Sequence, residues 1–122
     1  MAAILVVDDD PNARLLLRTL LTYAGHSVSE ASNGGEGLAA AADERPDLIV
    51  LDLSMPSMGG PEFVRALRAD PRCRSARVAL YTATAMNAAT RDFMEMYGIR
   101  SAIPKPSEPT ELLEAVERAL VA

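Results

Sequence analysis

Five polar residues of this chain stand at, or just past, the end of a short apolar run. They are Asp8, Asp9, Asp52, Thr82 and Lys105. Three carboxylates held close together repel one another, so such a group is stable only with bound protons, a nearby cation or a metal ion. A hard divalent ion suits this set best, because Mg2+ prefers oxygen ligands and commonly binds one or two carboxylates together with a phosphate. The residue types therefore predict a Mg2+ site.

The same residues are suited to phosphoryl transfer. A carboxylate can act as the nucleophile and form an aspartyl phosphate, and Asp52 is the best placed candidate because it ends a fully apolar run. Lys105 brings a compact positive charge that can balance Asp52 and then hold a phosphoryl oxygen. Thr82 offers a hydroxyl donor, and the backbone carbonyl of Ser54 offers one more oxygen to a metal. Stabilising the phosphoryl oxygens with a metal and a lysine is the main help this reaction needs.

The elements that must position these residues alternate along the chain. Apolar runs and turn signals predict strands over residues 3–7, 27–31, 48–51, 78–82 and 101–103. Helices are expected to begin at Pro11, after Asn33 to Gly35, at Pro61, near Asn87 and near Ser107 to Pro109. In the first helix, one apolar face is formed by Leu16, Leu17, Leu20, Leu21 and Ala24.

This alternation predicts an α/β fold in which a parallel sheet has helices on both faces. Right-handed crossovers, with a reversal of strand order next to the first strand, place the binding crevice at the carboxyl ends of the strands. The five polar residues come from distant parts of the chain and would converge on that one edge.

Four segments, ILVVDDDP, DLIVLDLSMPSMGG, ALYTATA and PKP, resemble the four signatures of response-regulator receiver domains. The resemblance spans nearly the whole chain. It implies a single receiver domain over residues 1–122, with a flavodoxin-like, doubly wound sheet of five parallel strands in the order 2-1-3-4-5 and five helices. It also implies a phospho-acceptor switch of a two-component system, similar to chemotaxis regulators, that catalyses only its own phosphorylation and dephosphorylation.

The resemblance assigns roles to particular residues. Asp52 would accept the phosphoryl group from a phosphohistidine kinase or phosphotransfer protein, and Thr82 and Lys105 would contact that group. The Lys105–Pro106 peptide bond would be cis. The implied Mg2+ ligands are two acidic residues, the phospho-acceptor and one backbone carbonyl, namely Asp8, Asp9, Asp52 and Ser54.

The chain departs from the family where the signal is passed on. Most receivers have an aromatic residue three positions before the conserved lysine, and this chain has Ala102 there. We therefore expect phosphorylation to be retained while its conformational readout, over strands 4 and 5 and helices 4 and 5, is altered. The expected switch region is Thr82, Ala83, Thr84 and Ala102. Ser54 and Thr84 occupy the places at which the family tunes the lifetime of the phosphoryl group.

Composition restricts the partners and the compartment. The formal net charge is -5 over 122 residues, which argues against direct nucleic-acid binding because phosphate contacts need a clustered basic face. The sequence contains neither a signal-peptide pattern nor a long apolar run, so we expect a cytoplasmic protein with no membrane span. We interpret Cys73 as a surface thiol and His26 as a turn residue.

Two other functions stay open. Phosphatases of the haloacid-dehalogenase type also use an aspartyl nucleophile, but they have a second Asp two residues later, where this chain has Ser54. A degenerate receiver that serves only as a binding or dimerisation module is the other alternative, and Ala102 favours it slightly.

Overall fold

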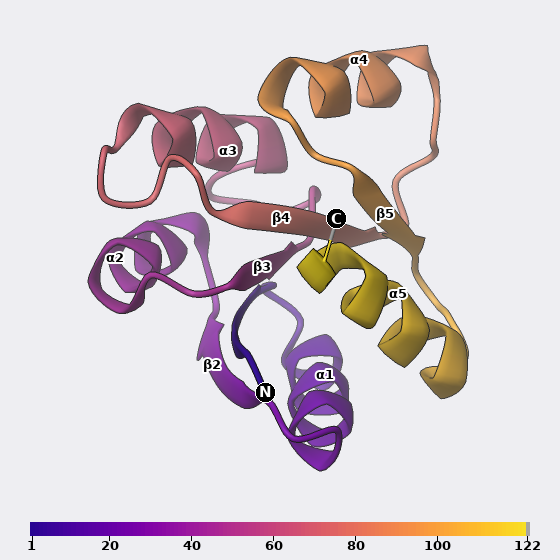
Figure 1. The fold of residues 1–122 in the computed structure, drawn as a ribbon. Coiled ribbons are helices and arrows are strands. Elements are labelled where there is room, and N and C mark those ends of the chain that lie inside the picture. Colours follow the sequence, from indigo (N-terminus) through magenta and orange to yellow (C-terminus); the bar gives the residue numbers. More distant parts are fainter. Residues whose placement is uncertain (122) are drawn as a thin grey trace.

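Five strands alternate with five helices in the computed structural model, which describes residues 1–121 (Figure 1). The strands are β1 (Ala3–Val7), β2 (Ser27–Ala31), β3 (Leu48–Leu51), β4 (Arg77–Thr82) and β5 (Ser101–Pro104). The helices are α1 (Pro11–Tyr23), α2 (Gly34–Glu44), α3 (Gly60–Ala69), α4 (Ala88–Tyr97) and α5 (Pro109–Val121). All neighbouring strands are parallel, in the order β2-β1-β3-β4-β5, which confirms the predicted doubly wound sheet.

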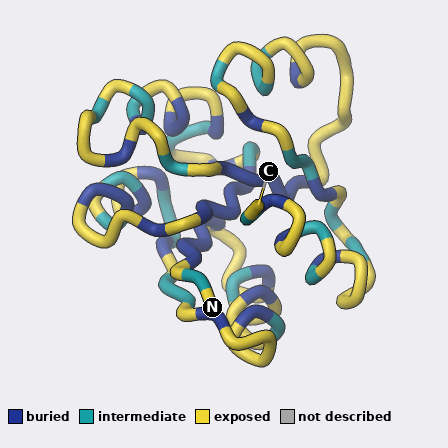
Figure 2. The backbone as a smooth tube through the Cα atoms, in the orientation of Figure 1, coloured by how far each residue is buried: buried dark blue, intermediate teal, exposed yellow. Residues whose placement is uncertain are grey.

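The sheet is buried on both faces, which explains why its central strands are continuous apolar runs. Helices α1 and α5 cover one face and α2, α3 and α4 cover the other (Figure 1). Every residue of β3 is buried, and the central strands form the buried interior in Figure 2. Alternate side chains of each strand point to opposite faces, so β3 supplies Ile49 and Leu51 to one apolar cluster and Leu48 and Val50 to the other.

Side-chain caps fix the starts of three helices. The Asp10 carboxylate accepts a hydrogen bond from the Asn12 amide at 2.9 Å, and Pro11 occupies the first position of α1. Asn33 and Asn87 cap α2 and α4 in the same way. Because capping satisfies amides that have no partner inside the helix, these residues set where each helix begins.

The buried face of α1 differs from the predicted one. Ala13, Leu17 and Leu21 form the stripe that is buried, whereas Leu16 is 38% exposed. Ala24 is also exposed. A run of three consecutive leucines is compatible with several helical faces, and packing against the sheet selects residues four positions apart.

The prediction of a surface thiol was wrong, because Cys73 is buried in the α3–β4 connection. Arg68 folds this connection over the core: its guanidinium donates to the Arg74 carbonyl at 3.0 Å and to the Ala76 carbonyl at 2.6 Å. Burial raises the pKa of the Cys73 thiol. An arginine-rich segment can therefore cover an apolar site when a guanidinium group donates its hydrogen bonds to backbone carbonyls.

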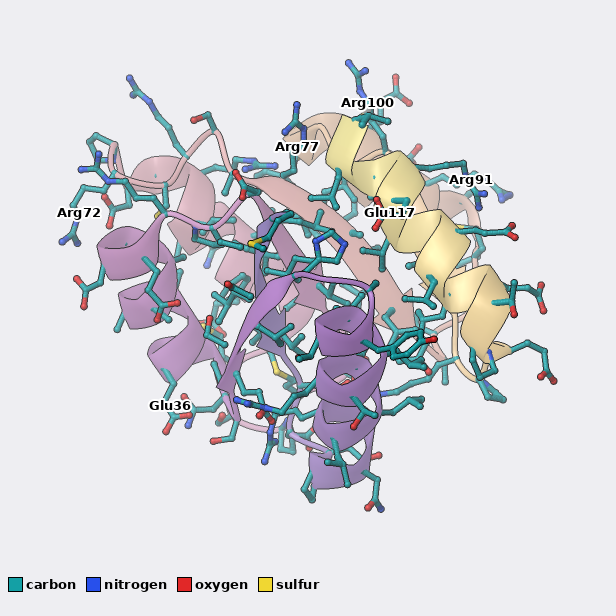
Figure 3. The ribbon with its side chains drawn as sticks, turned by 60° about the horizontal axis from the view of Figure 1, so that its bottom comes forward. Glu36, Arg72, Arg77, Arg91, Arg100 and Glu117 are labelled. Carbon is teal, nitrogen blue, oxygen red and sulfur yellow. The ribbon has the colours of Figure 1, made fainter. Side chains whose placement is uncertain are left out.

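His26 lies in the turn before β2, as expected, but it is buried and joins three parts of the fold. Its Nδ1 accepts a hydrogen bond from the Ala2 amide at 3.0 Å, and its Nε2 is 2.6 Å from a carboxylate oxygen of Glu117 on α5 (Figure 3). A ring nitrogen that accepts carries no proton, so Nε2 is the protonated nitrogen.

No helix among the described residues is long and apolar enough to span a membrane.

Gly60 offers a test of the packing beside the phospho-acceptor loop. A Cβ at this position would lie 2.8 Å from the Leu53 Cα, so the backbone would have to shift. We expect Gly60→Ala to lower the free energy of unfolding by about 1–3 kcal/mol, as overpacking usually does. Urea unfolding followed by circular dichroism measures it. Gly35→Ala is the control, because its Cβ would meet only the Asn33 side chain, at 3.4 Å. Equal stability of both variants would contradict this packing.

Candidate functional site

The carboxyl ends of the strands bring the predicted residues to one edge of the sheet. Asp8 follows β1, Asp52 follows β3, Thr82 ends β4 and Lys105 follows β5. Backbone hydrogen bonds between neighbouring strands continue past the strand ends. The Asp52 amide donates to the Val7 carbonyl and the Lys105 amide donates to the Thr82 carbonyl, both at 3.1 Å. The sheet itself therefore fixes the backbone from which the side chains extend.

The three acidic residues form a tight cluster. Carboxylate oxygens of Asp8, Asp9 and Asp52 all lie within 4.8 Å of one another. Asp8 is 1% exposed and Asp52 is 7% exposed, whereas Asp9 is open to solvent. Two of the carboxylates are thus withdrawn from water. Their mutual repulsion is screened less in this buried position than it would be in solvent.

Lys105 partly neutralises this cluster. Its Nζ donates to Asp8 Oδ2 at 2.8 Å and to Asp52 Oδ2 at 3.5 Å. The Lys105–Pro106 peptide bond is cis, as the resemblance implied. The same Nζ lies 5.4 Å from the centre of the Tyr81 ring, a cation–π distance. Sequence reasoning did not predict this contact.

The pKa values follow from burial and from Lys105. Burial raises the pKa of Asp8 above its ordinary value, although hydrogen bonds from Lys105 and from the Asp10 amide act in the opposite direction. Burial alone would lower the pKa of Lys105, but its hydrogen bonds and charge interactions with Asp8 and Asp52 outweigh burial and raise it. Lys105 is therefore held as a cation at the site.

The donor set fits a hard divalent cation. Three carboxylates face one ammonium group, so the ionised cluster keeps an excess of negative charge. Asp8, Asp9 and Asp52 supply the oxygen ligands that Mg2+ prefers. Ser54 lies beside them, since its amide donates to Asp52 Oδ1 at 3.2 Å.

Hydroxyl groups line the neighbouring side of the site. Thr82 Oγ1 donates to Thr84 Oγ1 at 3.1 Å and accepts from the Thr84 amide at 3.2 Å. Thr84 Oγ1 lies 3.0 Å from Ser54 Oγ. The two residues predicted to tune the lifetime are therefore in direct contact, and Thr82 is tied to them.

Ala102 leaves space beside Thr82. A cavity of about 400 Å³ is bordered by strand β5 and by the β4–α4 loop, including Thr82, Ala83, Thr84 and Ala102. No bulky side chain at position 102 couples this loop to β5. The residues that were expected to form the switch thus surround one cavity.

Sequence reasoning missed Arg14. Its guanidinium donates to the backbone carbonyl of Asp8 at 2.7 Å and lies 3.3 Å from Glu30. An arginine on the first turns of a helix looks like any surface cation in a sequence. Only the packing of α1 against β2 shows where it reaches.

The parallel sheet and an acidic cluster with a lysine at its carboxyl edge define a class of signalling domain with a flavodoxin-like fold. The comparisons agree, since the family described as "Response regulator receiver domain" matches residues 4–117. The chain belongs to the response-regulator receiver family. Such domains are signalling domains rather than classical enzymes, and they generally bind Mg2+ at an acidic pocket. They interact with histidine kinases or phosphotransfer proteins and with downstream effectors.

Individual relatives span the whole domain. The chain is 33% identical over 120 residues to Protein PilH of Pseudomonas aeruginosa, covering 98% of both chains. It is 29% identical over 117 residues to chemotaxis protein CheY of Thermotoga maritima, covering 94% of each. Chemotaxis protein CheY4 of Vibrio cholerae has a similar solved structure, with a TM-score of 0.90, 32% identity and 98% of both chains covered. The chain is thus a receiver domain of the CheY and PilH type.

The raised pKa of Asp8 can be tested in the metal-free protein. We expect its carboxyl group to titrate above 3.8, and Lys105→Met to raise that pKa further, because the ammonium group favours the ionised carboxylate. Carbon-13 NMR of the carboxyl group measures the midpoint. Arg65→Met removes an equal charge from an exposed part of α3 and should leave it unchanged. A lower Asp8 pKa in Lys105→Met would contradict the assignment.

The direction of the stability effect follows from this pKa. Because the folded-state pKa of Asp8 is raised, its stabilising contribution is fully present below 3.8 and is lost as the pH rises through the folded-state value. The ionised form of Asp8 is therefore the form that lowers the stability of the metal-free protein, and it is the form that a divalent cation would stabilise.

Proposed function

We propose that this chain is a phospho-acceptor switch of a two-component system in which Asp52 receives the phosphoryl group. The observation that carries the proposal is the position of Asp52, nearly buried at the sheet edge beside Asp8 and 3.5 Å from Lys105 Nζ. In the transfer, a bond forms between an Asp52 carboxylate oxygen and phosphorus. The bond between phosphorus and the donor imidazole nitrogen breaks, and its electron pair stays with the imidazole.

The neighbouring residues have separate tasks in this proposal. Asp8, Asp9, Asp52 and the Ser54 carbonyl would hold Mg2+. Bound there, the ion supplies positive charge to the oxygens of the transferring group. Lys105 holds one phosphoryl oxygen as a cation and Thr82 donates its hydroxyl group to another. Ser54 and Thr84 are our candidates for controlling the approach of the hydrolytic water and so the lifetime.

We place the switch in one receiver domain over residues 1–122, acting in the cytoplasm. Its partners would be a histidine kinase or histidine phosphotransfer protein and a downstream protein, with no direct nucleic-acid contact. The net charge of -5 supports the last point. The only reactions it would catalyse are its own phosphorylation and dephosphorylation, because Ser54 gives no general acid for the turnover of other substrates.

Intact mass spectrometry tests the phospho-acceptor. After incubation with acetyl phosphate and Mg2+, we expect the wild type to gain the mass of one phosphoryl group, and Asp52→Asn to gain none because an amide is not a comparable nucleophile. The adduct should also be absent without Mg2+. Asp43→Asn makes the same change at an exposed position on α2 and should be phosphorylated normally.

The outcomes separate the alternatives. An adduct on Asp52→Asn would place the acceptor elsewhere, and a wild type that gains no adduct would favour the degenerate binding module. Continuous release of phosphate from a small phosphate ester would instead favour the phosphatase, which a colorimetric phosphate assay detects.

The readout of phosphorylation should be local. When Thr82 turns its hydroxyl group toward a phosphoryl oxygen, its hydrogen bond to Thr84 breaks, and this bond holds the start of the β4–α4 loop. Because Ala102 has no bulky side chain, the movement of Thr82 is transmitted only weakly to β5. The proposed switch therefore changes the loop over residues 83–87 far more than α5.

Amide NMR shifts measure the extent of this change. On phosphorylation, we expect the largest shifts beyond the site itself over residues 83–87, and we expect Thr82→Val to lose them while still accepting the phosphoryl group. The valine side chain has nearly the same shape, with a methyl group in place of the hydroxyl group. Larger phosphate-dependent shifts throughout β5 and α5 would refute a local readout.

A further inference from the structure

Arg14 joins the acidic site to the edge of the sheet. It extends from α1, its Nη1 donates to the Asp8 carbonyl at 2.7 Å, and its Nε lies 3.3 Å from a carboxylate oxygen of Glu30 in β2. The Arg14 side chain is only 18% exposed. Glu36, at the start of α2 (Figure 3), is also close enough for the Arg14 charge to contribute to the lowering of its pKa, behind its hydrogen bonds with Ser32. The hydrogen bond to the Asp8 carbonyl and the ion pair with Glu30 thus hold this guanidinium in place.

The carbonyl that Arg14 holds belongs to the peptide between two candidate metal ligands. That peptide joins Asp8 to Asp9 and is planar, so fixing its oxygen restricts the orientation of both residues. The Asp8 side chain has its own restraints, since Oδ1 accepts from the Asp10 amide at 2.9 Å and Oδ2 accepts from Lys105. Asp9 is exposed, and the backbone is the route by which Arg14 can orient it.

We infer that Arg14 is a positioning residue for the metal site, holding the Asp8–Asp9 peptide so that both carboxylates converge on one Mg2+ ion. This inference rests on the proposed function. The sign of the effect separates geometry from charge. A cation this close to the site repels Mg2+, so loss of its charge alone would strengthen Mg2+ binding. Loss of its hydrogen bond would weaken binding, because outer partners keep ligands in their productive orientation.

Arg18 provides a matched control on the same helix. It pairs with the same Glu30, but its side chain is 50% exposed. Within residues 1–121, the hydrogen bond to the Asp8 carbonyl comes from Arg14 and not from Arg18. Arg18→Gln therefore removes an equal charge from the same neighbourhood and leaves the Asp8–Asp9 peptide held.

The test is a Mg2+ titration of the unphosphorylated protein followed by amide NMR. Arg14→Gln should weaken Mg2+ binding by about tenfold, the usual scale for loss of an outer partner of a metal ligand. Arg18→Gln should bind Mg2+ as the wild type does or slightly more tightly. In phosphorylation by acetyl phosphate, Arg14→Gln should need more Mg2+ for half-maximal rate and approach the wild-type rate at saturating Mg2+.

A metal-free readout makes the inference independent of phosphorylation. Nitrogen-15 relaxation should give order parameters near 0.85 for Asp9 and Asp10 in the wild type, the value for rigid backbone, and lower values in Arg14→Gln alone. Unchanged order parameters together with unchanged or tighter Mg2+ binding in Arg14→Gln would overturn the inference. A wild type that binds Mg2+ but is not phosphorylated would refute the proposed function and leave the Arg14 comparison valid.

Discussion

One electrostatic constraint underlies the site, because Lys105 alone cannot balance three clustered carboxylates. Its ammonium group bonds to Asp8 and reaches Asp52, yet the ionised cluster still holds excess negative charge. Burial makes this charge expensive, as the raised pKa of Asp8 indicates. A site of this kind is stabilised by whatever brings positive charge, and its conformation becomes sensitive to what it has bound. That sensitivity is the physical basis of a switch.

The parallel sheet makes such a cluster possible. Strands buried on both faces are stabilised by apolar contacts, so the chain can place polar groups just beyond them at little cost to the core. The neighbouring strand backbones then set the spacing between Asp8, Asp52 and Lys105, which lie far apart in the sequence. Contacts from outside the edge complete the arrangement: Tyr81 lies beneath the ammonium group and Arg14 holds the backbone of the acidic pair.

The strands and the convergence of Asp8, Asp52 and Lys105 on one edge could be predicted because they depend on local patterns, whereas the strand order followed from the resemblance to receiver domains. Apolar runs ending in acidic residues identify β1 and β3, and the shared direction of parallel strands brings their ends together. The burial of Cys73 and the contact of Arg14 could not be predicted, because which groups a side chain contacts depends on how distant elements pack. Cys73 is buried under a polar loop whose carbonyls bind Arg68, and Arg14 meets the Asp8 carbonyl where α1 lies against β2. Neither relation has a signal in a single sequence.

The most direct test of the central claim is a calorimetric Mg2+ titration of the wild type, Asp9→Asn and Asp10→Asn. The two variants lose the same charge at adjacent positions, and asparagine at position 10 can still cap α1. We expect one bound ion in the wild type, similar binding in Asp10→Asn, and at least about tenfold weaker binding in Asp9→Asn, which loses a ligand. Equal weakening in both variants, or no saturable binding in the wild type, would contradict a metal site built from Asp8, Asp9 and Asp52.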